Sequence, residues 1–153
     1  MNYKTPFYAA NLAIYQSLTK DGKMDWFDSS VPVFEIDDYF RKQEEFCYGI
    51  IGAEEADCTP NDDMVLWTVS TNLEVYSNYK GRKVIALKLE ELLNFFSSQE
   101  GWDALQDILH ANGFNLWGIS VGRMRMNMPM YSEKGIWQSG GTDITLKMTQ
   151  LEK

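Results

Sequence analysis

The stretch Ile119-Ser-Val-Gly-Arg-Met-Arg-Met-Asn-Met128 alternates apolar and polar residues, and the prediction of the fold starts from it. Met124, Met126 and Met128 share one face of an extended chain, because successive side chains of a strand point to opposite faces. A second pattern of period two follows, made of Ile136, Ile144, Leu146 and Met148. We therefore expect a terminal β-hairpin whose methionines pack in the core or at a subunit interface.

The outward face of this hairpin carries no side chains that are arranged for catalysis. Its residues are Arg123, Arg125, Asn127, Trp137, Asp143, Thr145 and Lys147. Arginines on such a face can pair with carboxylates of a neighbouring subunit. The candidate subunit-interface residues are Arg123, Arg125, Trp137 and Lys147.

Upstream of the hairpin, the clearest strand pattern runs from Met64 to Ser77. It places six residues on one face: Val65, Trp67, Val69, Thr71, Leu73 and Val75. Apolar residues then recur at helical spacing over 85–96 and 102–109, and Asn112-Gly113 ends the second helix. A first helix is expected after Thr5-Pro6.

The remaining strands are expected at Val31–Ile36 and from Phe46 towards Ala53, with a loop over 23–31. Helices with one apolar stripe must cover the apolar face of a sheet. The sequence therefore predicts a single α+β domain over 1–153. It has a mostly antiparallel sheet of about four to five strands, with two or three helices packed on one face.

A turn-rich acidic stretch follows, and we interpret it as a solvated loop over 54–63. Its carboxylates are Glu54, Glu55, Asp57, Asp62 and Asp63. The chain as a whole carries a formal charge of −8, from 14 basic and 22 acidic residues. A basic footprint for nucleic acid is therefore missing.

Few residues suit catalysis or metal binding. The chain has one histidine, His110, and two cysteines, Cys47 and Cys58, without the spacing of a zinc site. We expect no enzyme activity, no metal and no cofactor. No signal peptide and no apolar run of membrane-spanning length is present, so we expect an intracellular protein without a membrane partner.

The order of elements resembles the tail-terminator, or tail-completion, proteins of long-tailed bacteriophages and the related minor tail and neck proteins of the head–tail joint. The resemblance is carried by the helix Thr5–Leu18, the strand Val31–Ile36 and the central strand Met64–Ser77. It continues through the helix Val84–Phe96 to Arg123-Met-Arg-Met and a closing strand over 135–148.

The resemblance implies a structural virion protein that forms a homo-oligomeric ring, commonly a hexamer. Such a ring ends the tail tube and contacts tail-tube and head-completion proteins, and it assembles in the host cytoplasm. Genomic DNA crosses its opening without specific binding. Acidic residues of 54–63 would suit the lining of that opening, because like charge keeps a passing duplex from sticking.

A different class of function is also open. The small size, the acidic charge and the five tryptophans would suit a binding inhibitor, either a toxin-immunity protein or a mimic of DNA that blocks a nucleic-acid enzyme. A mimic would spread carboxylates along one face, whereas here they concentrate in 35–63. The ring is therefore the leading hypothesis.

Overall fold

Strand β7 (Gly135–Gln150) is the central strand of the protein. The structure is a computed structural model that describes residues 2–20, 24–28, 46–60, 64–79, 81–132 and 135–151. On one side β7 pairs antiparallel with β3 (Val65–Ser77), and on the other it pairs with β4 (Phe114–Val121). The rest of the sheet is built outward from these three strands.

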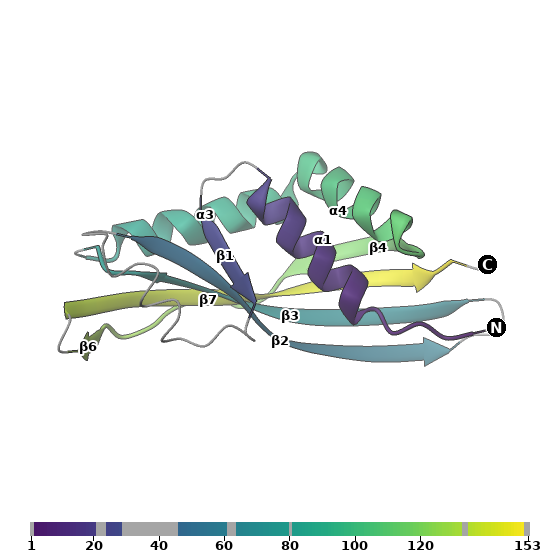
Figure 1. Ribbon diagram of the computed structural model, residues 1–153, viewed down its shortest axis with the longest axis horizontal. Helices are drawn as coiled ribbons and strands as arrows, with labels where there is room; N and C mark the ends of the chain where they lie inside the picture. Colours follow the sequence, from purple (N-terminus) through teal and green to yellow (C-terminus); the bar gives the residue numbers. More distant parts are fainter. Residues whose placement is uncertain are drawn as a thin grey trace.

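The described residues form seven strands and three helices (Figure 1). The strands along the main path of the sheet lie in the order β1-β2-β3-β7-β4, and β5 and β6 pair with β7 further along its edge. The remaining strands are β1 (Asp25–Asp28), β2 (Cys47–Pro60), β5 (Arg125–Met126) and β6 (Met130–Ser132). Only β1 and β2 run parallel, so the sheet is mixed but mostly antiparallel.

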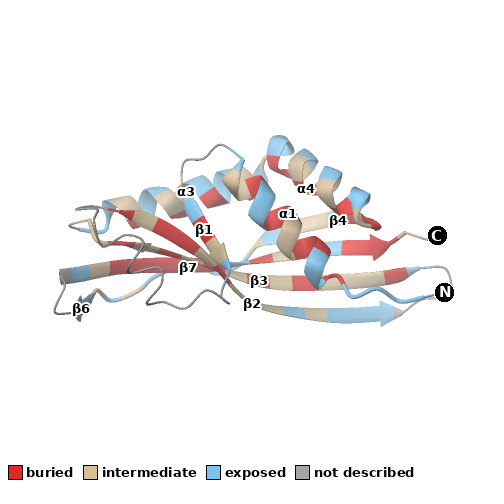
Figure 2. Cartoon of the chain, in the orientation of Figure 1, coloured by how far each residue is buried: buried red, intermediate tan, exposed pale blue. Residues whose placement is uncertain are grey.

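All three helices cover the same face of this sheet, which confirms the predicted α+β class (Figure 1). They are α1 (Phe7–Thr19), α3 (Lys83–Ser97) and α4 (Gln99–Ala111). The core lies between the helices and the sheet (Figure 2). Val69, Leu73 and Val75 of β3 are fully buried there, as their period-two spacing predicts.

A sharp corner joins α3 to α4 at Ser98. The Ser98 hydroxyl donates to the Phe95 carbonyl (2.8 Å) and accepts from the Gly101 N–H (3.0 Å), so it caps both helices at once. Gly101 is buried, and a Cβ on it would collide with the Phe95 carbonyl oxygen. The corner therefore requires glycine at this position.

Two predicted loops are wrong, because strand pairing extends through them. Residues 54–60 belong to β2, since β3 continues beside them as an antiparallel partner as far as Val65. Residues 25–28 form β1, where Trp26 is buried and occupies the space that a side chain on Gly49 would need. The predicted strand Val31–Ile36 and the carboxylates Asp62 and Asp63 lie outside the described residues.

The sheet also has more strands than the predicted four or five, because β1, β5 and β6 are too short to leave a periodic pattern. Gly140 and Gly141 pair in register with Val75 and Glu74. A Cβ on Gly140 would lie 2.8 Å from the Ile85 side chain. Gly140 therefore lets α3 approach the sheet closely.

Gly101→Ala should lower the free energy of unfolding by about 1–3 kcal/mol, because the added methyl group overpacks the corner. Ala86→Gly, at an exposed position of α3, is the control, and it should cost about 1 kcal/mol through helix propensity alone. Urea unfolding measures both changes. If Gly101→Ala raised stability, as alanine does in an ordinary helix, the corner would not depend on glycine.

Candidate functional site: an open strand edge beside an apolar groove

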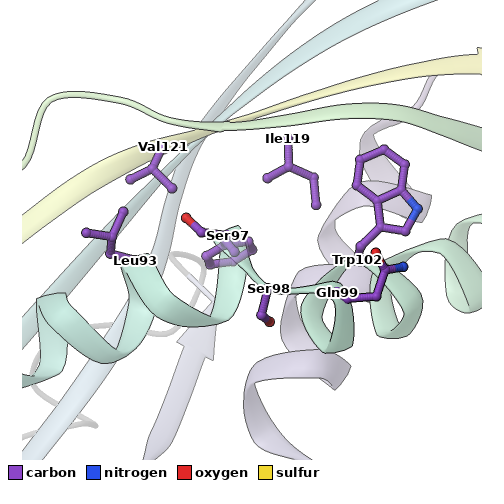
Figure 3. Close-up of a pocket in the computed structure, with 8 residues that line it drawn as sticks. Leu93, Ser97, Ser98, Gln99, Trp102, Ile119 and Val121 are labelled. Atoms are coloured by element: carbon purple, nitrogen blue, oxygen red, sulfur yellow. The ribbon is translucent and has the colours of Figure 1, made fainter.

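A groove of about 480 Å³ opens between the α3–α4 corner and the second half of β4 (Figure 3). We call it the α3–α4 groove. Its apolar lining consists of Leu93, Phe96, Trp102, Ile119 and Val121. Ser97, Ser98 and Gln99 contribute the polar part of the lining, and no charged side chain takes part. The groove is therefore an uncharged hollow with both apolar and polar walls.

Helix α4 covers the first half of the β4 edge and leaves the second half open. The Gln106 side chain accepts from the Leu116 N–H (2.7 Å) and donates to the Asn115 side chain (2.6 Å). The outward N–H of Leu116 is thereby satisfied within the chain. The groove begins where this cover ends.

At this open edge, the backbone N–H and C=O groups of Ile119 and Val121 point away from β7, within the plane of the sheet. The Gly122 N–H donates to the Asp143 carbonyl of β7 (2.7 Å). Residues of an antiparallel strand bond alternately to either side, so Ser120 also faces β7 while Ile119 and Val121 face away. Among the described residues β4 pairs only with β7. The edge therefore offers outward-pointing backbone N–H and C=O groups beside the α3–α4 groove.

The two long edges of the sheet differ in charge. Strand β4 contains no charged residue. The outer half of β2, which pairs only with β3 within the described ranges, carries Glu54, Glu55 and Asp57. Charged side chains on an edge discourage pairing with another chain. The β2 edge is protected in this way, and the β4 edge is not.

Among the methionines of 124–130, Met124 packs against the core of the chain, whereas Met126, Met128 and Met130 are 36%, 79% and 53% exposed. A position of these three at a subunit interface stays a prediction. Strand β4 ends at Val121, and the chain then continues along the edge of β7 towards β6 (Figure 1). Tyr131 is also exposed. The stretch Met124–Tyr131, which we call the methionine segment, is thus an apolar surface.

Arg125, Trp137 and Lys147 lie on the face of the sheet without helices, but they are spread along β7 and its edge. Arg125 forms an ion pair with Glu74 of β3, and Trp137 packs edge-on against Phe46 with ring centroids 5.0 Å apart. Both side chains are therefore engaged within the chain. Arg123 and Lys147 are exposed.

The acidic candidates divide between the two faces of β2. Glu55 and Asp57 are exposed on the face without helices, whereas Glu54 points to the helix side. Burial, with a smaller contribution from the charge of Asp28, raises the pKa of Glu54 to about 7. One Glu54 carboxylate oxygen is buried, and no described residue donates a hydrogen bond to it. Glu54 is therefore a partly buried strand residue with a desolvated carboxyl group, and it is not part of a solvated loop.

The thiols and the histidine form no reactive group in the part of the chain that the structure describes. Burial raises the pKa of Cys47 to about 11, and its sulfur lies 3.5 Å from that of Met24. Cys58 and His110 are exposed. The described ranges contain no cluster of three or more His, Cys, Asp or Glu placed to hold a metal ion. None of the helices in these ranges has the length and apolarity needed to cross a membrane.

The α3–α4 groove was not predicted from the sequence, because its lining comes from α3, α4 and β4, which are separate in the chain. One signal was available: residues 108–132 contain no Asp or Glu in a strongly acidic chain. That uncharged and basic run contains both the open half of β4 and the methionine segment.

Comparisons with known proteins add no family to this picture. No protein-family model matches the chain. No curated protein matches its sequence either. The function is therefore argued from the open β4 edge, the groove and the methionine segment.

The raised pKa of Glu54 predicts how stability changes with pH. The folded-state value of about 7 lies above the ordinary value of 4.5. The folded chain therefore holds this proton more tightly, so the stabilisation is complete below pH 4.5 and is lost as pH rises to about 7. Glu54→Gln should reduce the fall in the free energy of unfolding over this range.

Glu55→Gln is the matched control for that measurement, because Glu55 is exposed on the opposite face of the same strand. It should retain the wild-type decline in urea-unfolding experiments across the same pH range. Equal declines for wild type and Glu54→Gln would mean that Glu54 is ionised without cost in the folded chain.

Proposed function

We propose that this protein is a structural subunit that joins head to tail with copies of itself into a ring, and that the ring ends a phage tail tube. The observation that carries the proposal is the open second half of the β4 edge. Monomeric proteins protect long strand edges with charge, cover or bulges. Here the β2 edge is acidic, and the first half of the β4 edge has the cover of α4 and an irregularity between Leu116 and Gly118. Residues 119–121 carry no charge, and no described strand pairs with their outer side.

Unlike edges favour head-to-tail assembly over a two-fold dimer. A head-to-tail contact joins two different patches of the same subunit, and it closes into a ring when the rotation permits. The chain carries such different patches, since the β4 edge adjoins a groove whereas the methionine segment exposes apolar side chains. A two-fold dimer would instead need one self-complementary patch.

The face of the sheet without helices suits the proposed opening of the ring. Glu55 and Asp57 are exposed on this face, beside the polar side chains of Thr68 and Ser70 on β3. Negative charge on the wall of a channel repels phosphate and lets a duplex slide without binding. This face would therefore line the passage for genomic DNA.

The face without helices gives less support to the hypothesis of a binding inhibitor. Two of its carboxylates are engaged within the chain, because Glu74 pairs with Arg125 and Asp143 accepts from the Asn72 amide (3.0 Å). A mimic of DNA would need a row of free carboxylates at regular spacing. Among the described residues, the face offers a short acidic stretch at β2.

Light scattering and negative-stain imaging of the purified protein test the proposal. At high protein concentration, wild type should give a multiple of the chain mass and closed rings. Val121→Glu should abolish assembly, because it places a charge at the open edge. Ser120→Glu is the matched control, since its side chain points to the other face, and it should still assemble.

A wild-type protein that stays monomeric at every concentration, and in the presence of tail tubes, would contradict the ring. A tight one-to-one complex with a toxin or a nucleic-acid enzyme would instead support the inhibitor. Assembly of Val121→Glu at the wild-type level would show that the β4 edge is not a contact.

A further inference from the structure

We infer that the methionine segment of one copy docks in the α3–α4 groove of the next copy, where its backbone pairs with the open edge of β4. The inference rests on the proposed self-assembly and names the two surfaces that meet. It makes the contact a strand addition, in which main-chain hydrogen bonds give affinity and a pocket for side chains gives specificity.

The groove has the two parts that such a contact needs. Ile119 and Val121 lie two residues apart on one edge, and both point their backbone groups away from β7. Their side chains also line the groove together with Leu93 and Trp102. An extended segment that paired with this edge would therefore place alternate side chains into the hollow.

The methionine segment is suited to be that extended segment. Met128 and Met130 are two residues apart, so in an extended chain they project to the same side. Methionine is unbranched and polarisable, and it fills irregular apolar pockets. Met128 and Met130 therefore have the same two-residue spacing as Ile119 and Val121 on the β4 edge.

Hydrogen bonds and strand pairing hold the segment against β7 before it binds. The Asn127 N–H donates to the Ser139 carbonyl (2.9 Å), and the Arg82 guanidinium donates to the Asn127 carbonyl (3.3 Å). Pro129 disfavours helical backbone at Met128. On the far side, Tyr131 pairs with Ile136 in β6 and β7. Little conformational entropy is then lost on docking.

Charge around the two surfaces is complementary. Residues 83–111, which form α3 and α4, carry five carboxylates against two lysines. One of the five is Asp103, whose carboxylate accepts a hydrogen bond (2.9 Å) from Gln99 of the groove lining. The methionine segment contains no carboxylate, and the exposed Arg123 adjoins it. This complementarity favours a second copy as the occupant, because both charges belong to one chain.

The segment cannot fill the groove of its own chain. Arg125 and Met126 are paired with Gly141 and Gly140 of β7, and β6 holds the far end of the segment to the same strand. The segment therefore runs onward from β4 along β7 and does not turn back beside β4 (Figure 1). The contact must be made between copies.

Mixing two complementary variants tests the inference. Val121→Glu blocks the groove and leaves the methionine segment intact. The double variant Met128→Glu with Met130→Glu blocks the segment and leaves the groove intact. Each variant alone should be monomeric by sedimentation velocity, and an equimolar mixture should give a complex of one chain of each, identified by native mass spectrometry.

In the mixture, the intact segment of Val121→Glu can dock in the intact groove of the double variant. The complex cannot grow further, because the remaining groove and the remaining segment both carry glutamate. Circular dichroism and urea unfolding of each variant establish that it is folded. If a variant unfolds, the milder Val121→Asn or Met128→Ser with Met130→Ser replaces it.

Three results would overturn the inference. Rings formed by either variant alone would refute this contact but leave the ring proposal intact, and the groove would then be free for another protein. Folded monomers that form no complex on mixing would refute the pairing of groove with segment. Wild-type protein that never assembles would refute both the inference and the ring, whereas open head-to-tail chains would refute the ring alone.

Discussion

The rest of the structure depends on the antiparallel ladder between β3 and β7. Its register is unbroken over twelve paired residues, from Leu66 with Thr149 to Ser77 with Gln138. Because side chains alternate along both strands, this register decides which residues meet the helices and which face outward. It also places Gly140 beneath α3, whose Ile85 side chain occupies the space that a Cβ would need. A shift of this register by one residue would turn the polar side chains of one strand towards the helices and expose its core residues.

The other edge of β7 is shared between β4 and the methionine segment, and both proposed surfaces arise from this sharing. The change occurs at Gly122, whose N–H is the last link of β4 to β7 and whose missing side chain leaves room for the Asp143 carbonyl. Before Gly122, the edge faces the hollow left by the α3–α4 corner. After it, the chain runs past the start of α3, where Arg82 donates to the Asn127 carbonyl, and Met126, Met128 and Met130 are exposed. One strand edge thus produces both a groove and an exposed apolar segment.

Local patterns predicted the elements that pack with one face inward. The strand 65–75 and the helices over 85–96 and 102–109 have this form, and the structure has all three. Residues 54–60 could not be read in this way, because their strand is imposed by pairing with β3 against an acidic, turn-rich composition. The methionine pattern left core and subunit interface open for a related reason: period two identifies the shared face but not whether another element covers it. The groove and the Arg125–Glu74 ion pair depend on distant segments, so no local pattern contains them.

Residue-resolved amide hydrogen exchange tests the central claim, which is that the second half of β4 is an open edge that copies of the chain complete. In dilute, monomeric protein, the Ile119 and Val121 amides should exchange rapidly, whereas the Gly122 amide, bonded to Asp143, should be protected. At concentrations where the protein assembles, exchange at Ile119 and Val121 should slow by orders of magnitude while Gly122 changes little. Protection of Ile119 and Val121 in the monomer, or rapid exchange in the assembly, would contradict the account.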